Sequence, residues 1–131
     1  MIGITFSAFD LLHAGHIAML EEAKQYCDYL IVGLHTNPQI ERAHKNKPVQ
    51  TTLERYIQLK GCKYVDEIIP YDTEEDLINI LKIYKPDVRI IGEEYRDKNF
   101  TGKDLVKVVY NKREHNYSST KLRERCSNSQ T

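Results

Sequence analysis

Residues 9–34 read FDLLHAGHIAMLEEAKQYCDYLIVGL, and this stretch determines the predicted fold. The short apolar run before it, residues 1–6, is partly β-branched and predicts a buried strand. Inside it, apolar side chains recur at helical spacing over residues 17–23, and the apolar run 28–36 has the length of a second strand. A strand, a helix and a second strand form the repeating unit of a parallel sheet.

The remaining sequence continues this alternation of helices and strands. It predicts a helix over 51–61, with Thr51 or Thr52 as N-cap and Gly61 as its stop, and a last helix that begins at Ser118 or Ser119. Between them we predict a strand at 65–70, a helix at 73–86, and strands at 87–92 and 104–110. The sequence therefore predicts an α/β protein: a single-domain, Rossmann-like, doubly wound parallel sheet of about five strands with helices on both faces. Residues 1–126 form the domain and 127–131 a disordered tail, and ligands are expected at the carboxyl ends of the strands.

The composition restricts the classes of partner. The chain has 131 residues with 19 Lys plus Arg and 19 Asp plus Glu, so zero net charge gives no basis for binding nucleic acid or a membrane surface. No window reaches the roughly 18 apolar residues that span a bilayer. Cys27, Cys62 and Cys126 lack the CxxC spacing of a zinc or redox site. We therefore expect a soluble cytoplasmic protein without a nucleic-acid or membrane partner.

Two histidines and a glycine follow the first predicted strand. His13 and His16 lie near the free N–H groups of a starting helix, which is a ready anion site, and Gly15 allows a phosphate to approach the backbone. The alternative is a solvated histidine pair, with Gly15 needed only for packing. Zinc is disfavoured because a third ligand and the HExxH pattern are absent, and GxGxxG and GxxxxGK[ST] are absent too.

The same residues carry a resemblance to a known superfamily. FSAFDLLHAGH, residues 6–16 with Thr5 before them, resembles the HxGH signature of the nucleotidyltransferases, and YSSTKLR at 117–123 resembles their second signature. Within that superfamily the chain is most similar to the cytidylyltransferases, those acting on glycerol 3-phosphate among them. Three segments carry this likeness besides SSTK: residues 9–34, 54–70 and 90–95.

The resemblance implies a reaction and its partners. A cytidylyltransferase transfers CMP from CTP to a small phosphorylated acceptor and releases pyrophosphate, without a covalent enzyme intermediate. The implied acceptor is glycerol 3-phosphate by default, with another polyol phosphate, a phospho-amino acid such as phosphoglutamine, or a phosphonate next. The product would be a CDP-activated precursor of a cell-surface polymer. Mg²⁺ would enter with the CTP phosphates, so no metal-ligating residues are predicted. The family is often dimeric, so we expect a homodimer.

The resemblance also implies a role for each candidate residue. The catalytic residues would be His13, His16, Arg113, Lys45 and Lys47. The nucleotide-binding residues would be Phe9, Asp10, Gly15, Arg55, Gly92, Ser118, Ser119 and Thr120. The acceptor-binding residues would be Lys63, Tyr95 and Tyr117. Three alternatives stay open. Asp10 either orients a histidine or caps the first helix. A solvated helix face is as good an interpretation of Arg55 and a better one of Lys63, and residues 118–120 would look much the same as plain N-cap residues.

The chain departs from the family pattern in segments expected to touch the acceptor. Ser7 and Ala8 stand where the cytidylyltransferases usually have glycine and threonine, and Tyr95 stands where tryptophan is common. Asn116 and Tyr117 replace a glycine and an isoleucine. The reaction is therefore better determined than the substrate. Two other readings remain: an adenylyltransferase of the same superfamily that uses ATP, and a non-catalytic nucleotide-binding module.

Overall fold

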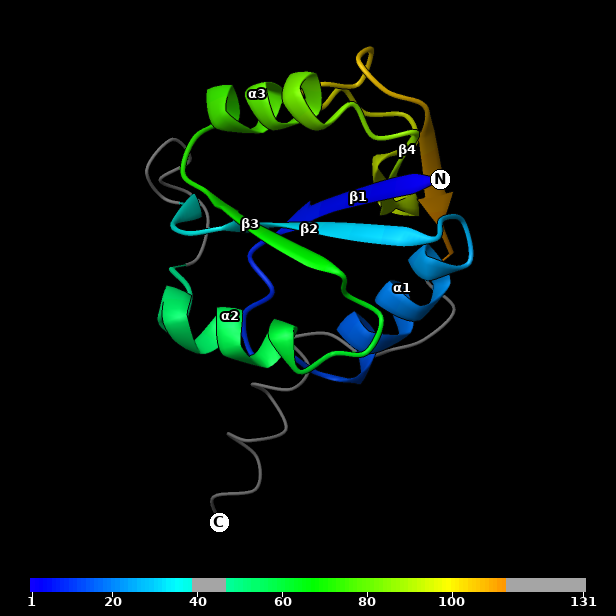
Figure 1. Ribbon diagram of the computed structural model, residues 1–131. Coiled ribbons are helices and arrows are strands. Elements are labelled where there is room, and N and C mark those ends of the chain that lie inside the picture. Colours follow the sequence, from blue (N-terminus) through cyan, green and yellow to red (C-terminus); the bar gives the residue numbers. More distant parts are fainter. Residues whose placement is uncertain (39–46, 113–131) are drawn as a thin grey trace.

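The computed structural model describes residues 1–38 and 47–112, in which strands and helices alternate as predicted (Figure 1). The elements are, in chain order, β1 Ile2–Ser7, α1 Ala14–Lys24, β2 Tyr29–His35, α2 Thr52–Lys60, β3 Glu67–Tyr71, α3 Glu74–Tyr84, β4 Val88–Gly92, the 3-10 helix η2 Glu93–Tyr95, and β5 Val108–Asn111. Helices α2 and α3 begin at Thr51 and Thr73, whose hydroxyls each accept a backbone N–H of the first turn.

The five strands form one parallel sheet in the order β3-β2-β1-β4-β5. Helices α1 and α2 cover one face of the sheet and α3 covers the other (Figure 1). The core under α1 and α2 is the larger cluster, with Phe9, Leu20, Leu34 and Leu59 fully buried, and the core under α3 is built around Ile4, Ile31 and Leu81. The predicted doubly wound sheet with helices on both faces is confirmed.

The pairing between β1 and β4 is much shorter than the pairing between β1 and β2. Strand β1 pairs with β2 along its whole length, but with β4 only at Gly3–Val88 and Ile4–Arg89. Both strands continue past this ladder toward their carboxyl ends. The chain also changes direction across the sheet here, because β1 continues to β2 on one side while β4 and β5 lie on the other. Such switch points are where open parallel sheets bind ligands.

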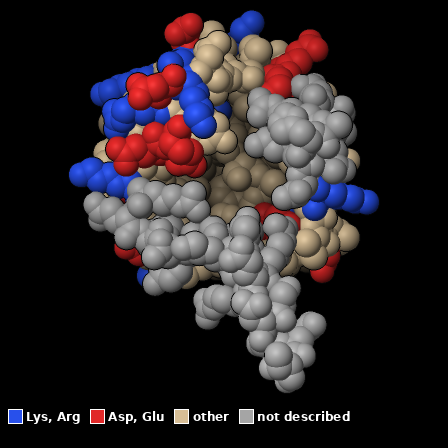
Figure 2. Space-filling model, turned by 180° about the vertical axis from the view of Figure 1, so that it is seen from behind, with Lys and Arg blue, Asp and Glu red and all other residues tan. Residues whose placement is uncertain are grey.

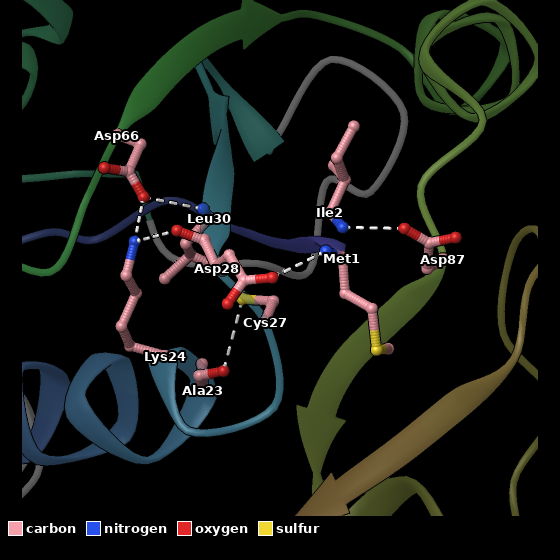
Figure 3. A network of polar contacts seen from close by, with 9 residues as sticks. All are labelled: Met1, Ile2, Ala23, Lys24, Cys27, Asp28, Leu30, Asp66 and Asp87. Carbon is pink, nitrogen blue, oxygen red and sulfur yellow. Dashed lines mark hydrogen bonds and ion pairs between the residues drawn. The ribbon is translucent and has the colours of Figure 1, made fainter.

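Polar contacts fix the amino ends of the strands, at the opposite edge of the sheet (Figure 3). The Asp87 carboxylate accepts the backbone N–H of Ile2 at 2.7 Å. The Asp66 carboxylate accepts the backbone N–H of Leu30 at 2.8 Å and forms an ion pair with Lys24. These contacts tie together β1, β2, α1 and the segments that enter β3 and β4.

The fifth strand is shorter than the sequence predicts. We predicted it over 104–110, but β5 runs from Val108 to Asn111 because its partner β4 is only five residues long and pairs with it from Arg89–Val108 to Gly92–Asn111. The predicted last helix, 118–126, and the tail lie outside the described residues. None of the helices within residues 1–38 and 47–112 has the length and hydropathy that a membrane crossing needs.

Candidate active site

The turn that joins β1 to α1 has a strained backbone, and hydrogen bonds to the segment before α2 fix it. Phe9 and Leu11 have φ angles of 50° and 52°, in the left-handed region that non-glycine residues rarely adopt. The Asp10 carboxylate between them accepts the backbone N–H groups of Val49 and Gln50 at 2.8 and 2.9 Å. The Gln50 side chain in turn accepts the backbone N–H of Leu11 at 2.8 Å. The segment before α2 therefore holds the turn in its strained conformation.

His13 and His16 cap the helix that they begin. His13 is the N-cap of α1, and its Nδ1 accepts the backbone N–H of Gly15 at 3.0 Å. The Nδ1 of His16 accepts the backbone N–H of His13 at 3.2 Å, and the two ring centroids are 4.0 Å apart. A ring nitrogen that accepts a hydrogen bond carries no proton, so in the neutral imidazole the proton lies on Nε2. The alternative of Asp10 as helix cap is therefore wrong, because His13 occupies that position.

His16 is neutral at physiological pH. Its pKa is lowered from 6.5 to about 4, chiefly by burial and also by the positive charge of a protonated His13, whereas Asp10 acts in the opposite direction. The ring also lies against Phe9, with centroids 5.6 Å apart, and Phe9 is itself buried. His16 is thus a neutral imidazole with a fixed tautomer, which is a hydrogen-bond donor through Nε2.

Arg55 is a buried residue that joins three segments, so the alternative of a solvated helix face is wrong. Its side chain is fully buried, with 1% of the residue exposed. The guanidinium donates to the carbonyls of Ala8, His35, Thr36 and Gln50, and to the hydroxyl of Thr52, at 2.6 to 3.3 Å. All five N–H groups are used within the protein. The geometry therefore makes Arg55 a positioning residue for the ends of β1 and β2 and the start of α2, and leaves it no donor for the predicted nucleotide contact.

A cavity of about 520 Å³ opens where β1 and β4 stop pairing. It is lined by the last residues of both strands, Thr5 to Ser7 and Ile90 to Gly92, which lie beyond the short ladder. One face of the molecule is visibly hollowed, with a floor of residues other than Lys, Arg, Asp and Glu (Figure 2). Of the described residues in the lining, four are charged: Asp10, Glu74, Arg89 and Glu94.

Five of the predicted site residues line this cavity: the catalytic candidate His16, the nucleotide-binding candidates Phe9, Asp10 and Gly92, and the acceptor-binding candidate Tyr95. His13 stacks beside His16, and Gly15 is buried in the first turn of α1. A side chain at Gly92 would overlap the Glu94 carboxylate, because a Cβ would lie 2.5 Å from it. Lys47 is exposed and adjoins Pro48, which lines the cavity.

The structure does not bring Lys63 to the cavity. Lys63 is exposed, its Nζ lies 5.2 Å from the Tyr64 ring, and it precedes the amino end of β3, whereas the cavity lies at the carboxyl ends of the strands. The other predicted site residues lie outside the described residues: Lys45, Arg113, Tyr117, Ser118, Ser119 and Thr120. Within the described residues, no three His, Cys, Asp or Glu side chains gather as a metal site would require.

One residue of the cavity was missed at the level of sequence. Arg89 is the only charged residue of β4, in the run VRIIG, and it lies 5% exposed against the cavity. A single charge inside an otherwise apolar strand of a parallel sheet was the available signal, because such strands are buried on both faces.

Known proteins share this fold and these motifs. The family described as cytidylyltransferase-like matches residues 4–125. The glycerol-3-phosphate cytidylyltransferase of Bacillus subtilis (strain 168) is 36% identical over 121 residues, which cover 92% of this chain and 93% of that protein. The bifunctional protein HldE of Caulobacter sp. (strain K31) is 35% identical over 127 residues, but the chain spans only 26% of its length. The crystal structure of a lipopolysaccharide core biosynthesis protein from Thermoplasma volcanium GSS1 superposes with a TM-score of 0.69 and 26% identity, covering 90% of this chain and 98% of that one.

Proposed function

Because the chain belongs to the cytidylyltransferase-like family of nucleotidyltransferase enzymes, we propose that it transfers CMP from CTP to a small phosphorylated acceptor and releases pyrophosphate. The observation that carries this proposal is the fixed tautomer of the histidine pair at the start of α1, beside the cavity. Glycerol 3-phosphate is the first acceptor to test, since it is named in the similar Bacillus subtilis enzyme. The CDP-linked product would serve as a precursor of a cell-surface polymer.

The chemistry is an in-line displacement at the α-phosphorus of CTP. An oxygen of the acceptor phosphate forms a new bond to that phosphorus, the bond to the β-phosphate oxygen breaks, and pyrophosphate leaves with the bonding electron pair. The protein positions both reactants and stabilises the negative charge that grows on the transferring and leaving groups. The neutral His16 ring has one N–H group, at Nε2, and donates a hydrogen bond from it to a phosphate oxygen. The start of α1 adds the partial positive charge of a helix N-terminus.

Other predicted residues enter this proposal on the family pattern. Arg113, Lys45 and Lys47 would contact the triphosphate, and Ser118, Ser119 and Thr120 would bind its outer phosphates. We propose that Mg²⁺ enters with CTP, bound to phosphate oxygens, where it neutralises part of their charge. Asp10 and Arg55 act indirectly. They fix the turn that precedes the histidines and the ends of the neighbouring strands.

The test is pyrophosphate release with each of CTP, ATP, GTP and UTP, with Mg²⁺ and a panel of phosphorylated acceptors, combined with the mass of the product. Release with CTP and a CMP-linked product would support the proposal, whereas release only with ATP would favour the adenylyltransferase reading. CTP binding without any product would favour a non-catalytic nucleotide-binding module.

The same assay tests the role of the histidine. His16→Ala removes a donor to the transferring phosphate, and such losses cost about a hundredfold to a thousandfold in kcat. His16→Gln is the matched variant, because its amide N–H falls near the position of Nε2, and it should retain more activity than His16→Ala. Near-normal turnover by His16→Ala would remove His16 from the mechanism.

A further inference from the structure

Arg89 is a buried cation with no carboxylate at ion-pair distance among the described residues, although the negative charge of Glu74 acts on it from farther away. It lies on β4, 5% exposed, and lines the cavity on the face of the sheet covered by α3. The Phe6 and Phe100 rings lie 4.9 and 5.0 Å from its guanidinium carbon. Gly33 makes room for Phe6, because a Cβ there would lie 2.2 Å from its ring. The sheet is therefore built to hold Phe6 against this guanidinium.

Only one of the three guanidinium nitrogens has an acceptor among the described residues. Nη1 donates to the Thr101 carbonyl at 2.5 Å, whereas the buried Nε has no hydrogen-bond partner and none is found for Nη2. Nε and Nη2 form the side edge of the guanidinium, from which two parallel N–H groups bind a carboxylate in two-pronged fashion. That edge is unused in the protein.

No carboxylate neutralises the charge at close range. Among residues 1–38 and 47–112, no Asp or Glu oxygen lies within 4.0 Å of Arg89, although Glu74 and Glu94 line the same cavity. A buried charge without a partner is costly, and aromatic rings offset only part of that cost. Buried groups left without a partner therefore require an explanation, and binding of a ligand is one.

We propose that Arg89 binds a carboxylate of the phosphorylated acceptor, so that the substrate is a phosphorylated acid rather than a phosphorylated polyol. The proposal rests on the proposed function, since it places the acceptor in the cavity between His16 and Arg89. The acceptor phosphate would lie toward His16, and its carboxylate would lie in the plane of the guanidinium, because the N–H groups of Nε and Nη2 point outward in that plane.

The local charges favour a carboxylate over a second phosphate. A carboxylate carries one negative charge and two coplanar oxygens, which match one cation with one unused edge. A phosphate carries up to two negative charges, and here it would meet a single arginine in a cavity that also holds Glu74 and Glu94. The same two acidic residues suit an acceptor that carries an ammonium group beside its carboxylate.

The test compares acceptors that differ at one carbon. Glycerol 3-phosphate and 3-phosphoglycerate differ only in a hydroxymethyl group against a carboxylate, and O-phosphoserine differs from 3-phosphoglycerate only in an ammonium group that replaces the 2-hydroxyl. With Mg²⁺ and CTP, we expect kcat/KM for the carboxylate-bearing acceptors to exceed that for glycerol 3-phosphate by about tenfold to a hundredfold, the effect of a buried hydrogen-bonded charge. A preference for glycerol 3-phosphate, or for a propanediol bisphosphate over 3-phosphoglycerate, overturns the proposal.

Variants assign the preference to Arg89. Arg89→Met keeps the length of the apolar stem and should abolish the preference, so that the ratio of kcat/KM for 3-phosphoglycerate to kcat/KM for glycerol 3-phosphate falls about tenfold or more. Arg89→Lys keeps the charge but loses the two-pronged edge, and should give an intermediate ratio. Arg96→Met is the matched control, because Arg96 is exposed, pairs with Glu93 at 3.8 Å, and does not line the cavity. A carboxylate preference that survives Arg89→Met overturns the proposal.

A binding measurement separates this proposal from the proposed function. If the enzyme proves to use ATP and not CTP, the ratio of kcat/KM values for the same acceptors is measured with ATP. If no nucleotide reacts, the proposed function fails. Calorimetric titration of the three acceptors into wild type and Arg89→Met then tests by binding alone whether Arg89 holds the carboxylate. Binding of 3-phosphoglycerate or O-phosphoserine that weakens about tenfold or more in Arg89→Met supports the assignment. Equal binding by both proteins, or no binding of either acid, overturns it.

Discussion

At the scale of single residues, the histidine pair shows how hydrogen bonds decide a chemical state. Each Nδ1 accepts a backbone N–H, so the proton of each neutral ring is assigned to Nε2. The bonds that begin α1 are the same bonds that set the tautomers. Helix capping and phosphate recognition therefore depend on one local arrangement, and a change at His13 would alter both.

The lowered pKa of His16 predicts a loss of stability in mild acid. The pKa is about 4 in the folded protein and near 6.5 when unfolded, so between these values the unfolded chain binds a proton that the folded chain does not. The free energy of unfolding therefore falls as the pH falls from about 6.5 to 4. At about 1.4 kcal/mol per pH unit, the loss from this residue is at most about 3.5 kcal/mol.

Denaturation of wild type and His16→Gln in urea at pH 7 and pH 4.5 measures this effect. The stability of wild type should fall more steeply than that of the variant, whose amide does not titrate. Parallel loss in the two proteins would mean that His16 titrates normally in the folded state.

At the scale of elements, the two capped helices offer a matched comparison. Thr51 and Thr73 cap α2 and α3 through the same reciprocal bonds, with Glu54 and Asp76. Thr51→Ala and Thr73→Ala should each cost about 1 kcal/mol of stability. Only Thr51→Ala should raise KM for CTP, because Thr51 follows the segment that binds Asp10. Equal kinetic effects in the two variants would contradict the coupling between α2 and the turn.

Arg55 joins α2 to the strand ends, so its replacement should affect both folding and catalysis. Arg55→Lys keeps the charge but has three donors for the five acceptors that Arg55 binds, so at least two acceptors lose their hydrogen bond. An unpaired buried acceptor costs about 1–3 kcal/mol. We expect the free energy of unfolding to fall by about 3 kcal/mol or more and KM for CTP to rise. Thermal unfolding and steady-state kinetics measure both, and Arg96→Lys at an exposed position is the control. Unchanged stability would show that the five bonds are dispensable.

The sequence predicted the order of the elements but not their ends. Periodicity and the stop signals located every strand and every α-helix that the structure describes, but not the 3-10 helix η2. The start of β5 was wrong because it depends on the length of its neighbour β4, which is a property of the sheet and not of residues 104–110. Likewise, the motif identified His13 and His16, but which backbone group each Nδ1 accepts depends on side-chain rotamers.

Arg55 and Arg89 show the same limit for the site. A helix pattern places Arg55 on a surface and a strand pattern only marks Arg89 as unusual, because burial of an arginine depends on carbonyls and rings from segments far apart in sequence.

At the scale of the whole molecule, stability and function lie at opposite edges of the sheet. Burial alone would raise the pKa of Asp66, but hydrogen bonds from Lys24 and from the Leu30 backbone hold it below its ordinary value. This contribution to stability is present at neutral pH and is lost as the pH falls through that lowered pKa. Asp66→Asn should cost about 1 kcal/mol and leave kcat unchanged, since the contacts lie at the amino ends of the strands.

Asp28→Asn is the natural comparison, because the Asp28 side chain is 91% exposed and its ion pair is with the terminal amine. It should unfold at nearly the wild-type temperature. A fall in kcat in Asp66→Asn, without loss of fold, would show that the two edges of the sheet are coupled.

The short ladder between β1 and β4 makes the sheet two half-sheets, β3-β2-β1 and β4-β5, joined by two residue pairs. The ends of β1 and β4 pair with β2 and β5 but not with each other, and a ligand that fills the cavity contacts both ends and so links the two halves. Without the ligand, the two half-sheets should move relative to each other at these two residue pairs. Amide hydrogen exchange in β1 and β4 beyond Ile4 and Arg89 should therefore slow when CTP binds. The bound substrate would then stabilise the contact between the two half-sheets as well as react in the cavity between them.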